Sequence, residues 1–90
     1  MVDLPAGVVI RKVGNMVHLG GRFNVAEGAD DWILLFTLPH EYRPKGMVPC
    51  GVNSETGALE IWIEPDGSVL ADSPRPGWVD LEMIDYVAAA

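Results

Sequence analysis

The most reactive side chains in this sequence are two histidines, His18 and His40, and one cysteine, Cys50. A zinc site needs Cys and His ligands at short, regular spacings, and neither histidine forms such a spacing with Cys50. A nucleophilic thiol needs a base within hydrogen-bond reach, which the sequence alone does not provide. A buried, inert thiol is therefore the favoured interpretation, and we predict neither a metal site nor a cofactor.

Acidic residues offer two further kinds of chemistry. Glu27, Asp30 and Asp31 lie close together in a polar stretch and could bind calcium. The stretch lacks the alternating oxygen ligands and central glycine of a calcium loop, which favours a solvated acidic loop.

The second acidic group is Asp80, Glu82 and Asp85, near the end of the chain. Paired carboxylates carry out glycoside hydrolysis. Alternation along a strand would make Asp80 and Glu82 neighbours on one face, and charges on a solvent-facing strand are the favoured interpretation. We predict that the protein is not an enzyme, and a small glycan hydrolase is the alternative.

Trp62 is the aromatic residue in the most unusual position. In "ALEIWIE" it lies between Glu60 and Glu64 on the polar face of the strand. A large apolar residue on a polar face indicates a subunit contact, packing under a loop, or a platform for a ligand. Trp32 and Trp78 each begin a strand, and we expect both to fill the core.

The length, net charge and cysteine content of the chain limit the classes of function. Ninety residues predict one domain, residues 1–90. A net charge of −7 argues against nucleic acid, which requires clustered Lys and Arg. The longest apolar run is far shorter than the roughly 18 residues that span a membrane. A single cysteine allows no internal disulfide and is compatible with folding in the cytoplasm. No signal peptide is visible, and the start "MVDLPAG" indicates an expressed fragment or a very short gene product.

Ten glycines, seven prolines and no sustained helical periodicity predict an all-β protein. Gly14-Asn15 is typical of a two-residue hairpin turn, and Pro65-Asp66-Gly67 of a tight turn. "WILLFTL" is apolar on both faces and should be central or at a subunit contact. "MVPCGVN" contains Pro49 and should be an edge or bulged strand. The expected strands cover 7–13, 16–23, 32–38, 47–53, 58–64, 68–72 and 78–87.

The stretch "TLPHEYRP" ends the most apolar strand with a stiff, polar segment. Pro39 cannot donate to a ladder, and Pro44 stiffens the exit. Tyr42 can lay its ring over the end of the fold with its hydroxyl in water, and Arg43 can donate to backbone carbonyls. We interpret this segment as a structural corner rather than a ligand site.

Four segments occur in an order that resembles a known family: "RKVGNMVHLGGRF", "LPHEYRPKG", "GALEIWIEPDGSV" and "GWVDLEMIDYV". From about Val9 to Tyr86 the chain is similar to the C-terminal domain of minor tail, tail-fibre or receptor-binding proteins of siphophages, especially those that infect actinobacteria. No single segment is specific, but their order is moderately so. The chain departs from the family at Glu41, where glycine is usual.

This resemblance implies a small antiparallel β-sandwich of jelly-roll type with about seven strands. It implies a structural and adhesive function in the virion, at a tail or fibre tip, after synthesis in the host cytoplasm. The implied partners are other tail proteins, a host-surface component such as a saccharide, and two further copies in a homotrimer. A carbohydrate-binding or adhesin module outside any virus is the alternative.

The size of the chain also favours a trimer, because so small a domain buries only about 60% of its unfolded surface and association would relieve a marginal core.

The residues themselves, rather than the resemblance, predict the chemistry of a ligand. The charge of −7 disfavours anionic wall polymers. Neutral sugars suit a site of aromatic rings and carboxylates. Trp62, Glu60 and Glu64 are the predicted contacts, and Asp30 and Asp31 join them only if the fold brings their loop near.

Overall fold

Strands account for most of the regular structure. The structure is a computed structural model that describes residues 4–89. Over these residues the chain forms one three-residue 3₁₀ helix and eight strands, all paired antiparallel. Their bounds are β1 Val8–Val13, β2 Met16–Val25, β3 Trp32–Thr37, η1 His40–Tyr42, β4 Val48–Ser54, β5 Gly57–Ile63, β6 Ser68–Asp72, β7 Gly77–Asp80 and β8 Asp85–Val87.

The predicted all-β class and its turns are confirmed. Val13 pairs with Met16 across the Gly14-Asn15 turn, where Gly14 has a φ of +61° that suits glycine. At the other predicted tight turn Gly67 has a φ of +93°, and Asp66 accepts a hydrogen bond from the Ser68 backbone N–H at 2.9 Å. None of the described helical residues forms a segment long and apolar enough to cross a membrane.

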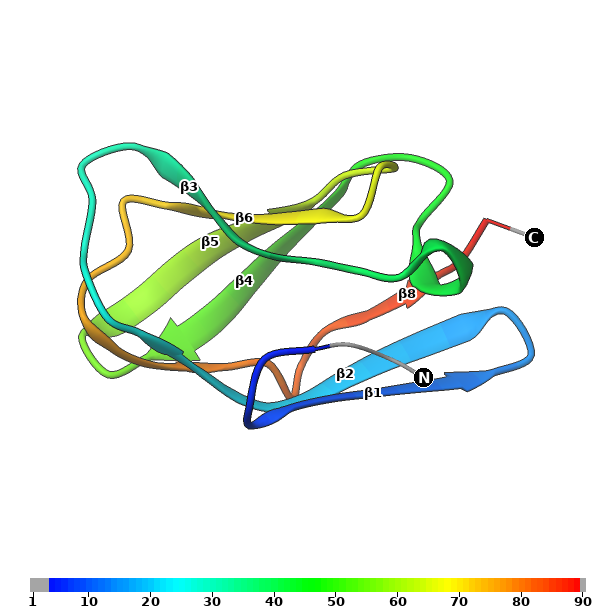
Figure 1. Ribbon diagram of the computed structural model, residues 1–90, viewed down its shortest axis with the longest axis horizontal. Helices are drawn as coiled ribbons and strands as arrows, with labels where there is room; N and C mark the ends of the chain where they lie inside the picture. The colour runs from blue at the N-terminus through cyan, green and yellow to red at the C-terminus, as the bar shows by residue number, and fades with distance from the viewer. Residues whose placement is uncertain (1–3, 90) are drawn as a thin grey trace.

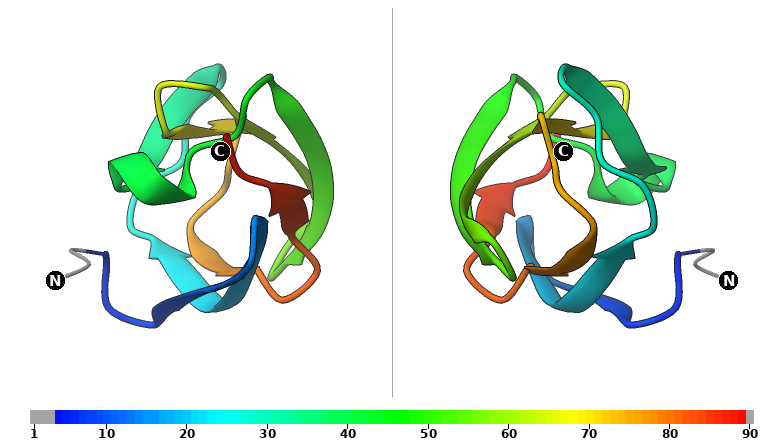
Figure 2. Two further views of the ribbon diagram at one scale, coloured as in Figure 1. Left: turned by 90° about the vertical axis from the view of Figure 1, so that its right-hand side faces the viewer. Right: turned by 90° about the vertical axis from the view of Figure 1, so that its left-hand side faces the viewer.

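The strands form one sheet in the order β1-β2-β7-β4-β5-β6-β3, with β8 also paired to β2. The long strand β2 joins two parts of this sheet. Its first half lies between β1 and β8, and its second half pairs with β7. Figure 1 shows β1, β2 and β8 grouped below the β3–β6 strands, and the end-on views of Figure 2 show the sheet curling around its interior.

The predicted positions of two strands are confirmed only in part. β3 is not central, because it pairs only with β6 and ends the sheet, and its predicted alternative position at a subunit contact stays a prediction. β4 lies between β7 and β5 in the sheet order, and the bulge lies in β3 between Leu34 and Phe36. β4 meets β7 only through Ser54, so most of its second side has no ladder partner among residues 4–89 and is an edge, as predicted. Pro49 can therefore sit in β4 if its missing N–H faces that side.

The predicted closing strand 78–87 is two strands. β7 ends at Asp80, whose carboxylate accepts a hydrogen bond from the Glu82 N–H at 3.0 Å. The Ile84 N–H then donates to the Leu81 carbonyl and closes a turn. A continuous strand would place Leu81 and Ile84 on opposite faces, whereas the turn buries both almost completely.

The core is continuous across both parts of the sheet and consists of apolar side chains and one tyrosine. It contains the inward residues of every strand except β1 and of the turns that join them. Its members are Val17, Leu19, Val25, Phe36, Leu38, Val52, Leu59, Ile61, Ile63, Val69, Ala71, Val79, Leu81, Ile84, Tyr86 and Ala88.

Candidate functional site

The outward face of β5, β6 and β3 carries an apolar patch. Trp62 on β5 pairs with Leu70 on β6, and Leu70 pairs with Leu34 on β3. Trp32 lies two residues before Leu34 on the same face, opposite Asp72. We call these four residues, Trp32, Leu34, Trp62 and Leu70, together with Glu60, the tryptophan face. It is supported from beneath by the buried side chains that alternate with it.

The two tryptophans of this face contact each other. Their ring centroids are 4.8 Å apart and their planes are inclined by 46°. The indole N–H of Trp62 donates to Glu60 Oε1 at 2.6 Å, which fixes the orientation of both side chains. The expectation that Trp32 fills the core is therefore wrong. Trp78 is also half-buried and outside the core, and its ring lies 4.2 Å from the Arg22 guanidinium carbon.

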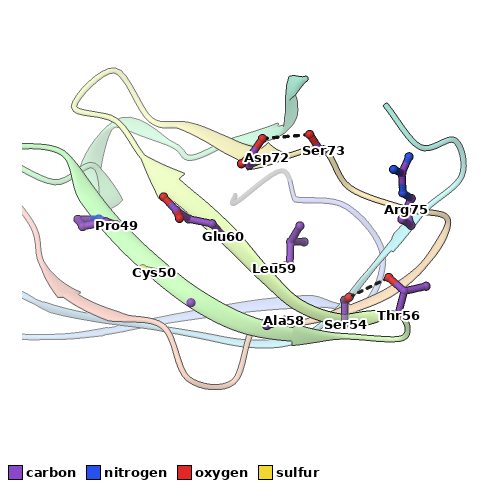
Figure 3. Close-up of a pocket in the computed structure, with 11 residues that line it drawn as sticks. Pro49, Cys50, Ser54, Thr56, Ala58, Leu59, Glu60, Asp72, Ser73 and Arg75 are labelled. Atoms are coloured by element: carbon purple, nitrogen blue, oxygen red, sulfur yellow. Dashed lines mark hydrogen bonds between the residues drawn. The ribbon is translucent and has the colours of Figure 1, made fainter. Parts of the chain in front are cut away.

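A hollow of about 770 Å³ adjoins Glu60. It forms because β6 pairs with β5 only through Ile61–Ile63, so the first half of β5 is left without a partner on that side. Figure 3 shows Glu60 and Asp72 on the two strands that border this opening. The hollow is lined by Pro49, Cys50, Gly51, Ser54, Thr56, Ala58, Leu59, Glu60, Asp72, Ser73 and Arg75.

The charged groups of the hollow are two carboxylates and one guanidinium. Arg75 donates to Asp30 Oδ1 at 3.2 Å, so the cation already has an anionic partner. Glu60 and Asp72 hold no ion pair among residues 4–89, although Asp72 accepts a hydrogen bond from the Ser73 hydroxyl at 3.1 Å. The hollow is therefore acidic on balance and rich in hydrogen-bond acceptors.

Ser73 has an unusual backbone at the rim of the hollow. It is the sole non-glycine residue with a positive φ, +49°, in the part of the chain that the structure describes. Left-handed backbone at a residue other than Gly, Asn or Asp costs free energy, of order 1–3 kcal/mol, and such residues cluster at functional sites. Ser73 N–H donates to the Asp31 carbonyl at 3.1 Å, which helps hold the strained residue in place.

The fold brings the predicted acidic loop close to this site. The Ala29 N–H donates to the Pro74 carbonyl at 3.0 Å, and a Cβ on Gly28 would stand only 2.8 Å from that same oxygen. This close approach places Asp30 against Arg75 at the hollow. Asp31 directly precedes Trp32, whose N–H its carboxylate accepts at 2.8 Å.

Glu64 does not line the hollow, which borders the first half of β5. It follows β5, and its N–H donates to the Ser68 carbonyl at the β5–β6 turn. The structure therefore places Trp62 beside Glu60. Asp30 reaches the hollow through Arg75, and Asp31 contacts the backbone of Trp32 on the tryptophan face. Glu64 lies at the end of β5. Whether these residues bind a ligand stays a prediction.

The predicted corner residues lie between β3 and β4. Pro39 precedes η1, and Arg43 Nε donates to the Leu38 carbonyl at 3.0 Å. The Tyr42 ring packs on the core, and its carbonyl accepts a hydrogen bond from the Tyr86 hydroxyl at 2.6 Å. Pro44 forms a single bridge to Ala88. These contacts connect the segment to β8, which the sequence did not indicate.

The remaining reactive groups have other partners. No group of three or more His, Cys, Asp or Glu side chains within residues 4–89 could hold a metal ion. Burial raises the pKa of the Cys50 thiol, which makes it a poor nucleophile at neutral pH. His18 Nδ1 contacts Asp85 Oδ1 at 2.6 Å, and Glu82 Oε1 accepts the Gly21 N–H at 3.0 Å. These carboxylates contribute hydrogen bonds within the fold.

Comparison of the chain with protein-family models and with curated protein sequences gives no match. The geometry of the site is therefore the basis for its interpretation. Trp32, Asp72, Ser73 and Arg75 were not predicted as site residues. Ser73 and Arg75 lie in the stiff "SPRPG" connector, and its two prolines were the one available signal that this segment is held in place.

Proposed function

We propose that this chain is a receptor-binding domain of a phage tail or tail-fibre protein and that the tryptophan face binds a neutral saccharide of the host surface. The observation that carries the binding part is the fixed arrangement of Trp62. Its ring packs on Trp32, its N–H is held by Glu60, and Glu60 also lines the hollow. An aromatic platform therefore adjoins a cavity of acceptors.

This combination suits a sugar for physical reasons. An indole ring covers the apolar face of a sugar ring, and carboxylates accept hydrogen bonds from its hydroxyls. Glu60 and Asp72 supply such acceptors at the hollow. Anionic wall polymers fit less well, because a net charge of −7 repels them over a Debye length of about 8 Å at physiological salt. The proposed ligand is therefore an uncharged sugar.

The jelly-roll sandwich is part of this proposal, and the strand pairing supports it. A jelly roll folds an eight-stranded ribbon so that the first strand meets the last and the inner strands pair in nested order. Three nested pairs are present here: β2 with β7, β3 with β6, and β4 with β5. The outermost pair differs, because β1 and β8 both pair with β2.

Assembly as a homotrimer in the virion, beside other tail proteins, also belongs to the proposal. The end strand β3 supports it, because its outer side has no ladder partner among the described residues and Leu34 is 55% exposed. Unpaired edge strands are ready templates for pairing with another chain.

Binding to an array of neutral and anionic bacterial cell-wall saccharides tests the function. We compare the wild type with Trp62→Leu, which removes the ring and the N–H donor but keeps an apolar side chain. Trp78→Leu is the matched control, since Trp78 is equally half-buried but lies on β7. We expect Trp62→Leu to lose at least tenfold in affinity for neutral sugars and Trp78→Leu to bind normally.

Light scattering on the same samples separates the two interpretations of Trp62. Lost binding with an unchanged mass supports a sugar platform. A smaller mass places Trp62 in a subunit contact instead. Equal binding and equal mass for the wild type and Trp62→Leu would reject both interpretations, and preferential binding of anionic polymers would reject the neutral-sugar assignment.

A further inference from the structure

Exposed apolar side chains are concentrated on the outward face of β1, β2 and β8. Val9, Val13, Met16 and Val87 are 60%, 63%, 40% and 58% exposed. We call the outward residues of these three strands, with the carboxylate of Glu82, the three-strand face. Figure 1 shows β1 and β2 at the opposite side of the molecule from β3 and β6, with β8 between β2 and the segment that follows β3. This face lies apart from the tryptophan face and has no role in the proposed sugar site.

Strand register arranges this face in rows that run across the three strands. The first row is Val13, Met16 and Val87, one residue from each strand and all apolar. The second row is Arg11, His18 and Asp85, which runs from a cation on β1 to an anion on β8. Adjacent rows are about 7 Å apart, because two residues separate them along each strand.

The third row is more open. Val9 pairs with Gly20, and the Glu82 carboxylate lies where a Gly20 side chain would be, with Oε2 3.4 Å from the position of a Cβ. A hollow of about 510 Å³ forms here because Gly20 contributes no side chain. Arg11, His18 and Asp85 of the second row also line this hollow, whereas the residues of the apolar row do not.

We propose that a second copy of this chain docks on the three-strand face through a two-fold axis that runs parallel to β2. Such an axis places β1 of one copy opposite β8 of the other and β2 opposite itself. Val13 then meets Val87 of the second copy, and Met16 meets Met16. Arg11 meets Asp85, and by symmetry Asp85 meets Arg11.

The charge pattern is what selects a second copy as the occupant. A two-fold interface must be complementary to itself, so that each residue meets a partner it suits. Here apolar residues meet apolar residues, Arg11 meets Asp85, and His18 meets His18 of the other copy on the axis. An in-plane axis perpendicular to β2 that crosses the second row fails this requirement, because it would place Arg11 against Arg11 and Asp85 against Asp85.

The small size of the face, and the repulsion between two chains that each carry a net charge of −7, make this association weak. Three strands at about 4.8 Å spacing and six residues at about 3.4 Å rise cover roughly 300 Å². Stable complexes bury about 800 Å² per partner. The dimer should therefore form at high chain concentration, or where copies are held close together. The proposed trimer uses β3 instead, so the two contacts are compatible, and the number of chains in the particle distinguishes them.

Sedimentation of the intact chain over a concentration series up to the millimolar range tests the proposal. The wild-type mass should rise toward at least twice its value at low concentration, which is 9.7 kDa for a single chain and three times that value for the proposed trimer. Met16→Glu puts two like charges together on the axis and should abolish the rise. Met47→Glu is the matched control, because Met47 is 48% exposed but lies outside the three-strand face. It should associate like the wild type.

A charge-swap mixture provides the decisive measurement. In a dimer of Arg11→Glu, the new carboxylate of each copy faces Asp85 of the other copy. In a dimer of Asp85→Lys, the new ammonium of each copy faces Arg11 of the other copy. Like charges therefore meet at both symmetric contacts, and neither variant should dimerise. Mixing the two variants restores two attractive contacts per pair, and heterodimers should form. A wild-type mass that does not rise with concentration, a rise that survives Met16→Glu, or a mixture that does not associate would each overturn the proposal.

Discussion

The two outward faces of this domain use apolar side chains in opposite ways. On the tryptophan face, Trp32 and Trp62 pack on each other and a carboxylate holds the Trp62 N–H. On the three-strand face, Val13, Met16 and Val87 stand in a row, each more than a third exposed. The first face also shares Glu60 with a hollow, whereas the apolar row of the second face lines none.

This difference matches the two kinds of partner proposed above, a sugar and a second copy of the chain. Side chains fixed by local contacts lose little conformational entropy on binding, so they suit a small ligand that offers few contacts. A row of separate side chains gains from burial only when an extended surface covers all of it. The same sheet can therefore offer a small-molecule site and a protein contact without sharing residues between them.

The largest expected effect comes from Gly21, where β2 passes from one part of the sheet to the other. Gly21 has a φ of +78°, and a Cβ there would stand 1.9 Å from the Gly7 carbonyl oxygen. Gly21→Ala should lower the free energy of unfolding by about 2–4 kcal/mol, because both the backbone strain and the clash act against the β1–β2 pair. Urea denaturation measures this loss.

Gly46→Ala is the control, because a Cβ at Gly46 meets no atom within 4 Å and its φ is not positive. Its effect should stay within about 0.5 kcal/mol. If hydrogen exchange in Gly21→Ala increases equally on both faces, the two regions unfold as one unit. Faster exchange confined to β1, β2 and β8 would show that they are separable.

Sequence was sufficient where the relevant contact is local. Alternation placed Glu60 and Trp62 on one face, and the turn residues Gly14 and Gly67 marked two hairpins that the structure contains. The contact of Trp32 with Trp62 was not predictable, because it depends on β6 pairing with both β5 and β3. Pairs between distant strands are set by how the whole sheet curls.

The split of the last strand was missed for a similar reason. Polar and apolar residues alternate from Asp80 to Met83, and this pattern hides the turn in which the Asp80 carboxylate accepts the Glu82 N–H. That bond is local, but Asp occurs in strands and turns alike, and the burial of both Leu81 and Ile84 decides between them. The hollow could not be predicted because it exists only where β6 leaves β5.

A smaller effect is expected at Tyr86, which lies beneath the three-strand face. Its hydroxyl donates to the Tyr42 carbonyl at 2.6 Å, and burial raises the pKa of its phenol. Tyr86→Phe should lower stability by about 1 kcal/mol at neutral pH, the usual net contribution of one hydrogen bond. Tyr42→Phe removes a hydroxyl that is not the donor of this bond and serves as the control.

The pH dependence sharpens this prediction. A phenol whose pKa is raised by folding stabilises the native state fully below the unfolded pKa of about 10, and this contribution is lost as the pH rises further. The wild type should therefore lose stability above about pH 10. Thermal midpoints of Tyr86→Phe should fall less over that range, and an equally steep fall would contradict the assignment.

The smallest effect is expected at Asp66, in the turn that joins β5 to β6 beside the tryptophan face, and its sign is opposite. The hydrogen bond from the Ser68 backbone N–H lowers the pKa of the Asp66 carboxyl. A carboxylate with a lowered pKa stabilises the native state above its unfolded pKa of about 3.9, and this contribution is lost as the pH falls through the folded value.

Asp66→Asn keeps an acceptor oxygen but cannot ionise, so its thermal midpoint should match the wild type more closely at acid pH than at neutral pH. Ser68→Ala keeps the backbone donor and should retain most of the acid dependence. If Asp66→Asn loses as much stability as the wild type below about pH 4, another carboxylate controls the acid response, and the contrast between an alkali-sensitive and an acid-sensitive region fails.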